Sequence, residues 1–205
     1  MSEFLLQTEK LPRRSQRVAL RILGWAGWKV RFAPLPGPRG VMIVYPHTSN
    51  WDFPIGVLAK WAVGVPIRWL AKDSLFTGIG GFFFGRLFRY WGGEPIERKA
   101  ATGAIDRIAE HMRSADHFWL ALTPEGTRGY RPYWRSGFYH IALAAQVPIA
   151  IAYIDYATRV LGVVDHFIPT GDVERDMDFI RNAFAGKQGY RQEWAGAITL
   201  QPPEK

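Results

Sequence analysis

Short apolar runs that alternate with helical stretches constrain the fold of this chain most. Such a run, bounded by turn-forming residues, is typical of a strand that is buried on both faces of a sheet. The expected strands are Val41–Tyr45, Pro66–Ala71, Phe118–Thr123, Val147–Ile154 and Val160–Ile168. The expected helices are Asp52–Val63, Phe76–Trp91, Thr102–Ser114, Phe138–Gln146 and Asp172–Phe184. This alternation predicts an α/β fold: one layered domain with a mostly parallel or mixed central sheet flanked by helices.

The N-terminal part is expected to form an amphipathic helix over Pro12–Phe32. Val18, Ile22 and Trp25 recur there at helical spacing among Arg and Lys residues. Such a helix either packs on the core as an ordinary surface helix or lies in a membrane interface, with its basic residues on lipid headgroups. We therefore divide the chain into an N-terminal amphipathic membrane-surface segment, residues 1–40, and a main domain, residues 41–200.

The chain is basic, with a formal net charge of +8, and it contains nine Trp and thirteen Phe residues. A basic surface suits a polyanionic partner, and aromatic rings beside Lys and Arg favour an anionic membrane surface. No ribonucleoprotein motif or zinc-finger spacing occurs, so no nucleic-acid partner is expected. Lys60 and Arg68 interrupt the longest candidate for a membrane span, Phe53–Leu70. We therefore expect a peripheral protein without a transmembrane helix.

His47 and Asp52 are five residues apart in the sequence, across the junction between an expected buried strand and an expected helix. Histidine titrates near neutrality and can take the proton of a hydroxyl that attacks a carbonyl. A carboxylate on the other ring nitrogen fixes the tautomer and stabilises the imidazolium. The chain has no cysteine and no serine in a nucleophile-elbow motif, so the expected nucleophile is a hydroxyl of the substrate. Asn50 is a candidate N-cap for the following helix.

Two other interpretations of the histidines receive less support. His111 and Asp116 repeat the spacing of His47 and Asp52, but no buried strand precedes them. We interpret that second pair as solvated surface residues. A metal site at His47 is not expected, because no second histidine lies at ligand spacing from it.

A second polar loop, which contains Glu125, Gly126, Thr127 and Arg128, directly follows the expected strand Phe118–Thr123. A glycine between polar residues lets backbone amides approach an anion closely, and the planar guanidinium of Arg128 matches a phosphate or carboxylate. A turn with exposed arginines is the simpler alternative. Because this loop and the loop after Tyr45 both follow buried strands, they are expected to lie side by side at one edge of the sheet.

These motifs together resemble those of the glycerolipid acyltransferases, the family of the lysophosphatidate (1-acylglycerol-3-phosphate) acyltransferases. The resemblance lies in the HX4D pair His47-x4-Asp52 and in the Glu-Gly-Thr-Arg loop that follows it about eighty residues later. Further similar segments run from Val41 to Ile154, and they keep the order of the family's motifs. They are Lys72–Phe76, Gly92–Arg98, Arg135–Gly137 and Val147–Ile149.

The resemblance implies an α/β acyltransferase domain over residues 41–200, with His47 as the general base and Asp52 as its orienting partner. It also implies an acceptor site formed by Arg98, Glu125, Gly126, Thr127 and Arg128. The acyl donor would be acyl-CoA or acyl-carrier protein, a co-substrate, with no further cofactor. The acceptor would be a lysophospholipid, lysophosphatidate foremost, in phospholipid biosynthesis at the cytoplasmic face of a membrane.

Two alternatives stay open at the level of the sequence. The basic, Trp-rich N-terminus is also typical of a non-enzymatic membrane-binding module. An acyltransferase with a non-glycerol lipid acceptor would carry the same catalytic pair. The aromatic stretch Phe82–Phe88 either lines a groove for the acyl chain or packs in the core.

Overall fold

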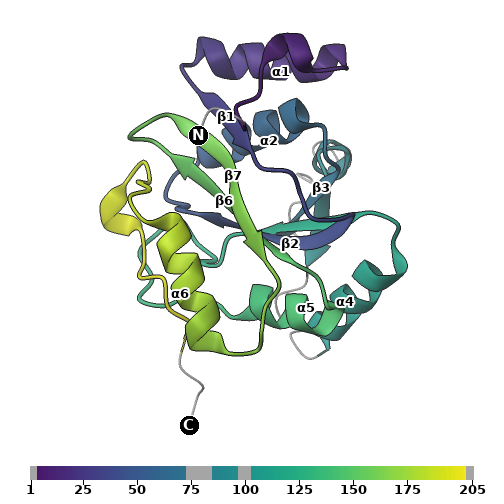
Figure 1. Ribbon diagram of the computed structural model, residues 1–205, viewed down its shortest axis with the longest axis vertical. Helices are drawn as coiled ribbons and strands as arrows, with labels where there is room; N and C mark the ends of the chain where they lie inside the picture. Colours follow the sequence, from purple (N-terminus) through teal and green to yellow (C-terminus); the bar gives the residue numbers. More distant parts are fainter. Residues whose placement is uncertain (1–3, 73–84, 97–102, 202–205) are drawn as a thin grey trace.

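The computed structural model describes residues 4–72, 85–96 and 103–201, and these residues form layers of helices around one sheet (Figure 1). The sheet has seven strands in the order β1-β7-β6-β2-β5-β3-β4. The strands are β1 (Lys29–Phe32), β2 (Arg39–Tyr45), β3 (Ile67–Lys72), β4 (Gly93–Ile96), β5 (Phe118–Leu122), β6 (Ile149–Asp155) and β7 (Val160–Phe167). Only β6 and β7 pair antiparallel, and the other neighbours run parallel. The predicted α/β fold with a mixed sheet is therefore confirmed.

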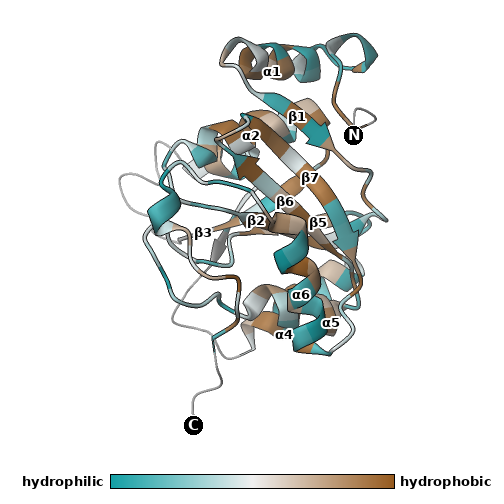
Figure 2. Ribbon diagram, turned by 60° about the vertical axis from the view of Figure 1, so that its left-hand side comes forward, coloured by the Kyte–Doolittle hydropathy of each residue, from teal (hydrophilic) through white to brown (hydrophobic). Residues whose placement is uncertain are grey.

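Helices cover both faces of the sheet (Figure 1). They are α1 (Arg14–Trp25), α2 (Asp52–Val63), α4 (Ala104–Ser114), α5 (Gly137–Ala145) and α6 (Val173–Phe184), with short 3-10 helices η1 (Thr8–Lys10) and η3 (Gln192–Trp194). On β2, Val41 and Ile43 pack in the core with α4, α5 and α6, whereas Met42 faces the opposite side. Burial on both faces explains why this strand is a continuous apolar run, visible as brown ribbon in Figure 2.

The predicted helix Pro12–Phe32 is wrong in its second half. Helix α1 ends at Trp25, and β1 begins at Lys29. Gly27 between them has a φ of +79°, a left-handed conformation that glycine adopts readily and that ends a helix. After this turn the chain enters the sheet, where β1 pairs with β7. Residues of the proposed N-terminal segment, 1–40, thus contribute an edge strand to the sheet.

Strand β4 was also missed, and like β1 it is a four-residue strand at an edge of the sheet. Such short edge strands carry little of the apolar periodicity on which the predictions depend. The predicted helix Phe76–Trp91 lies in large part outside the described residues, and its described part is helical at 85–90. The remaining predicted helices agree with the structure to within two residues at each end, and α2 agrees at both.

Candidate active site

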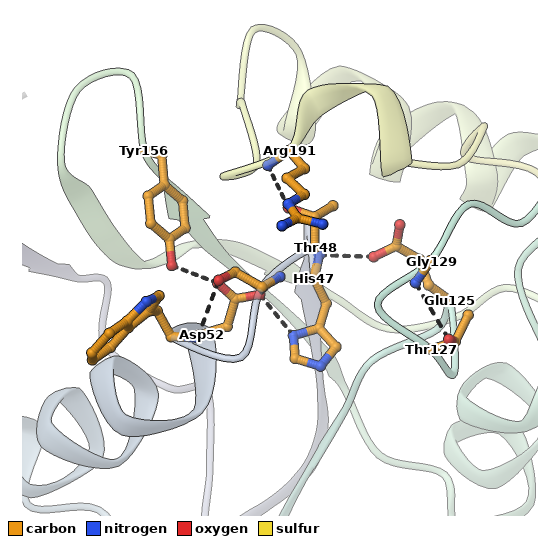
Figure 3. Close-up of polar contacts among 10 residues, drawn as sticks. His47, Thr48, Asp52, Glu125, Thr127, Gly129, Tyr156 and Arg191 are labelled. Carbon is orange, nitrogen blue, oxygen red and sulfur yellow. Dashed lines mark hydrogen bonds and ion pairs between the residues drawn. The ribbon is translucent and has the colours of Figure 1, made fainter.

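Three neighbouring strands of the sheet end beside one another and position the site. Strand β2 pairs in parallel with both β5 and β6, so the carboxyl ends of all three lie at one edge. The loop with His47 follows β2, the Glu-Gly-Thr-Arg loop follows β5, and the turn with Tyr156 follows β6. The expectation that the two motif loops lie side by side is therefore confirmed (Figure 3).

His47 and Asp52 form a close pair, with 3.0 Å between His47 Nδ1 and Asp52 Oδ2. Asp52 is the first residue of α2 and is 3% exposed. The backbone amide of Ser49 also donates to its Oδ2, at 2.9 Å, and Ser49 Oγ accepts the amide of Trp51 at 3.1 Å. Trp51 is the N-cap residue and makes no side-chain capping bond, so the expected cap at Asn50 is wrong.

The orientation of the imidazole gives it a chemical role. With Nδ1 bonded to the carboxylate, Nδ1 carries the ring proton and the lone pair lies on Nε2. The His47 side chain is 15% exposed, and its ring points away from Asp52 at the Nε2 side (Figure 3). A neutral imidazole held in this tautomer can accept the proton of a hydroxyl nucleophile.

Glu125 joins the two motif loops. It is 2% exposed, and its carboxylate accepts the backbone amide of His47 at 2.8 Å and that of Gly196 at 3.2 Å. Burial raises the pKa of this carboxyl, and the two backbone donors oppose the rise. The described contacts of Glu125 are therefore with backbone groups of the site, whereas its place among acceptor-binding residues stays a prediction.

The other residues of this loop are more accessible. Gly126 has a φ of +66°, and its amide bonds to the carbonyl of Thr123 at 2.9 Å. Thr127 Oγ1 accepts the amide of Gly129 at 3.3 Å. The Arg128 side chain is exposed. The loop thus forms a tight turn that presents cations to solvent.

Two exposed arginines later in the same loop, Arg131 and Arg135, lie close to this turn. Arg135 lies over Gly126, where an added Cβ would come within 3.0 Å of Arg135 Nε. Arg98, the remaining residue predicted for the acceptor site, lies outside the described residues, as do residues 73–76 of the Lys72–Phe76 motif. Its role stays a prediction.

The aromatic stretch Phe82–Phe88 is described only from residue 85 onward. Phe88 packs against the rings of Phe53, Trp69 and Trp91 at centroid distances of 6.5, 6.1 and 6.1 Å. For this residue the structure favours packing.

The sequence analysis missed a C-terminal segment, residues 186–201, that covers both loops. Arg191 donates its amide to Thr48 Oγ1 at 3.1 Å, and the carbonyl of Gly196 accepts the hydroxyl of Tyr45 at 3.1 Å. The guanidinium of Arg191 rests on the ring of Trp194 at 4.1 Å. This segment carries no periodic pattern, so nothing in its sequence marks it as part of the site. Tyr156 was missed too, although its position directly after the buried strand β6 was a usable signal.

In residues 4–72, 85–96 and 103–201, no three His, Asp or Glu side chains gather as ligands for a metal ion. Within the described part of the chain, every helix is too short or too polar to span a bilayer.

Comparison with known proteins assigns the chain to a family. The model of the acyltransferase family matches residues 28–154, more than half of the chain. A crystal structure of PlsC, the 1-acyl-sn-glycerophosphate acyltransferase of Thermotoga maritima, has the same fold, with a TM-score of 0.53 and 18% identity over 85% of this chain and 81% of that one. No curated protein matches this sequence. The chain therefore belongs to the acyltransferase family, and it is an acyltransferase enzyme.

Proposed function

We propose that this enzyme is an O-acyltransferase that moves a fatty acyl group from acyl-CoA or acyl-carrier protein to the hydroxyl of a lysophospholipid, with lysophosphatidate as the foremost acceptor. The observation that carries the proposal is the distance of 3.0 Å between His47 Nδ1 and the buried carboxylate of Asp52. This contact directs Nε2 away from the carboxylate, where it can serve as a base toward a hydroxyl.

In the proposed reaction, the acceptor's hydroxyl oxygen attacks the carbonyl carbon of the thioester while His47 Nε2 takes the hydroxyl proton. A C–O bond forms and the carbonyl electrons move onto oxygen, which gives a tetrahedral intermediate. When the intermediate collapses, the C=O bond re-forms, the C–S bond breaks, and the imidazolium returns its proton to the departing thiolate. Asp52 stabilises the imidazolium between these steps.

Direct transfer to the acceptor fits the composition of the chain, which contains no cysteine to form a thioester with the enzyme. A thioester is already activated, because the thiolate is a good leaving group. The chain's own part is thus to bind both substrates and move one proton. A single imidazole–carboxylate pair, as found among the described residues of the site, is enough for this proton transfer.

The loop after β5 supports an anionic acceptor. Arg128, Arg131 and Arg135 are exposed on this loop, and the loop is tied to the backbone of His47 through Glu125. Guanidinium groups bind phosphate through paired, charge-assisted hydrogen bonds. A phosphate bound here would hold an acceptor with its free hydroxyl within reach of the imidazole.

Product formation tests this proposal. Purified protein is incubated with lysophosphatidate, lysophosphatidylcholine or monoacylglycerol, and with acyl-CoA or acyl-carrier protein, and new esters are identified by mass spectrometry. The expected result is phosphatidate from lysophosphatidate, with less product from monoacylglycerol, which has no phosphate. Failure to acylate any lysolipid with either donor would contradict it.

We also propose that α1 rests on an anionic membrane, at its cytoplasmic face, where a lysolipid acceptor is available. Trp25, Ile22 and Val18 form an apolar stripe on α1 with 93%, 46% and 52% exposure. The helix packs on the protein through a different face, which carries Ala19, Leu20 and Leu23. Hydrophilic and hydrophobic residues alternate along α1 (Figure 2). An exposed apolar stripe beside arginines is typical of a helix that lies in a membrane interface, and the cytoplasmic leaflet is enriched in anionic lipids.

A further inference from the structure

Tyr156 binds the oxygen of Asp52 that His47 leaves free. Its hydroxyl donates to Asp52 Oδ1 at 2.6 Å, whereas His47 Nδ1 and the amide of Ser49 lie on Oδ2. Figure 3 shows the tyrosine and the histidine on opposite sides of the carboxylate. Tyr156 lies two residues beyond the segment that the family model matches, 28–154.

The ring of Tyr156 packs against two aromatic neighbours. The rings of Trp28 and Tyr156 form a T-shaped pair with a centroid distance of 5.0 Å and an interplanar angle of 88°. Tyr190, from the C-terminal segment, packs on it at 5.3 Å. Trp28 is 7% exposed, so the contact lies inside the protein. These neighbours restrict the ring to the rotamer that places its hydroxyl on Asp52.

The hydroxyl acts as a donor. Burial, together with the hydrogen bond to Asp52, raises the pKa of Tyr156, so the phenol keeps its proton at physiological pH. With this third donor, both carboxylate oxygens of Asp52 are fixed in direction. A carboxylate with one free oxygen can rotate about its bond to Cβ, and Oδ2 would then move away from His47 Nδ1.

We infer that Tyr156 is a positioning residue for acyl transfer: it holds the carboxylate of Asp52 in the plane that keeps His47 in its Nδ1–H tautomer. The inference rests on the proposed function of His47 as the base. It implies that the turn after β6, together with the two motif loops, helps to position the catalytic pair. Because Tyr156 acts through Asp52, its loss affects the proton transfer and leaves substrate binding unchanged.

The test compares two variants that each remove one tyrosine–aspartate hydrogen bond. Tyr156→Phe removes the bond to Asp52. Tyr139→Phe is the matched control, because the buried Tyr139 of α5 donates to Asp176 Oδ2 of α6 at 2.7 Å, and neither residue belongs to a motif loop. Each change deletes one hydroxyl and keeps the ring, so packing is preserved in both.

Two readouts are measured on wild type and both variants. In steady-state acyl transfer to lysophosphatidate, Tyr156→Phe is expected to lower kcat by roughly tenfold with KM near the wild-type value, while Tyr139→Phe keeps the wild-type kcat. In ¹⁵N NMR of the histidine rings, with the His47 signal identified by its loss in His47→Ala, Tyr156→Phe is expected to reduce the Nδ1–H tautomer of His47. Tyr139→Phe is expected to leave that tautomer unchanged.

The tautomer readout needs no substrate, so it separates this inference from the proposed function. If wild type transfers no acyl group to any lysolipid, the proposed function fails, and the tautomer population still decides the role of Tyr156. An unchanged His47 tautomer in Tyr156→Phe would overturn the inference. An equal loss of kcat in both variants, in proportion to their loss of thermal stability, would overturn it as well.

Discussion

The backbone amide of His47 donates a hydrogen bond of 2.8 Å to the carboxylate of Glu125, 78 residues further along the chain. Through its second oxygen the same carboxylate accepts the amide of Gly196. One buried side chain thus links the His47 loop, the arginine-bearing loop and the C-terminal segment. The two motif loops depend on this contact for their relative position.

Replacing Glu125 by Gln tests this bracing role. A glutamine keeps one acceptor oxygen but turns its NH2 group toward the other backbone amide, which leaves a buried donor unsatisfied. We expect a loss of about 1–3 kcal/mol in the free energy of unfolding and a drop of about tenfold or more in kcat/KM, because the His47 loop shifts. Urea unfolding and acyl-transfer kinetics measure both effects. Glu110→Gln, at an exposed residue of α4, is the control and should leave kcat/KM unchanged; equal values for both variants would contradict the bracing role.

The dependence of stability on alkaline pH tests the raised pKa of Tyr45, which lies near Glu125. Burial raises the pKa of Tyr45 to about 12, and the charge of Glu125 adds to the rise. Because the folded state holds this proton more tightly than the unfolded state, where the pKa is about 10, the resulting stability is complete below about pH 10 and is lost as pH rises to about 12. In wild type, this effect lowers the free energy of unfolding by about 3 kcal/mol across that pH range. We expect Tyr45→Phe to lack this decrease.

The measurement for Tyr45 is the difference in unfolding free energy between wild type and Tyr45→Phe at several pH values from 8 to 12. Taking the difference cancels the effect of Tyr139, Tyr153 and Tyr156, whose pKa values are also raised. The unfolding free energy of wild type minus that of Tyr45→Phe should fall as the pH rises from about 10 to about 12. A difference that stays constant with pH would show that Tyr45 ionises alike in the folded and unfolded chains.

The arginines of the loop after β5 are expected to bind the phosphate of the acceptor. Changing Arg128 or Arg131 to Gln should raise the KM for lysophosphatidate by about tenfold each, with a smaller change in kcat, since each removes a charge-assisted hydrogen bond. The KM for monoacylglycerol, which lacks phosphate, should not change. Arg175→Gln, an exposed arginine of α6 outside both loops, is the control. Equal losses with both acceptors would point to a role in folding or in donor binding.

The exposed stripe of α1 is expected to carry membrane binding. Trp25 is 93% exposed, so Trp25→Ser should leave the melting temperature unchanged. It should weaken binding to vesicles that contain anionic lipid by about tenfold, since it removes a large apolar side chain that would insert into the membrane interface. Co-sedimentation with vesicles at low and high salt measures this effect. Val173→Ser, at an exposed apolar residue of α6, serves as the control and should bind as wild type does.

The elements that could be predicted from the sequence are those with a strong local pattern. The central strands β2, β5 and β6 are buried on both faces and therefore appear as apolar runs, and their parallel order brings His47 and Glu125 to one edge as expected. The predicted helix Pro12–Phe32 wrongly included strand β1, because the four residues of β1 continue the mixture of apolar and basic residues found in α1. The turn between them, residues 26–28, contains the left-handed Gly27.

The part of the site that the sequence did not reveal consists of contacts between segments far apart in the chain. Tyr156 reaches Asp52 across 104 residues, and Arg191 reaches Thr48 across 143. The segment around Arg191 has no periodic pattern, and the position of Tyr156 after β6 indicates a strand end but not its partner Asp52. The Glu125 carboxylate points toward the backbone amides of His47 and Gly196. This orientation likewise depends on the pairing of β2 with β5.

The central claim is that the imidazole of His47 is the base that activates the acceptor hydroxyl. The most direct measurement is the rate at which purified wild type and His47→Ala convert lysophosphatidate and an acyl thioester to phosphatidate, with circular dichroism to verify that both are folded. We expect a steady rate for wild type and no phosphatidate above the enzyme-free background for His47→Ala. A folded His47→Ala protein that makes phosphatidate at the wild-type rate would contradict it.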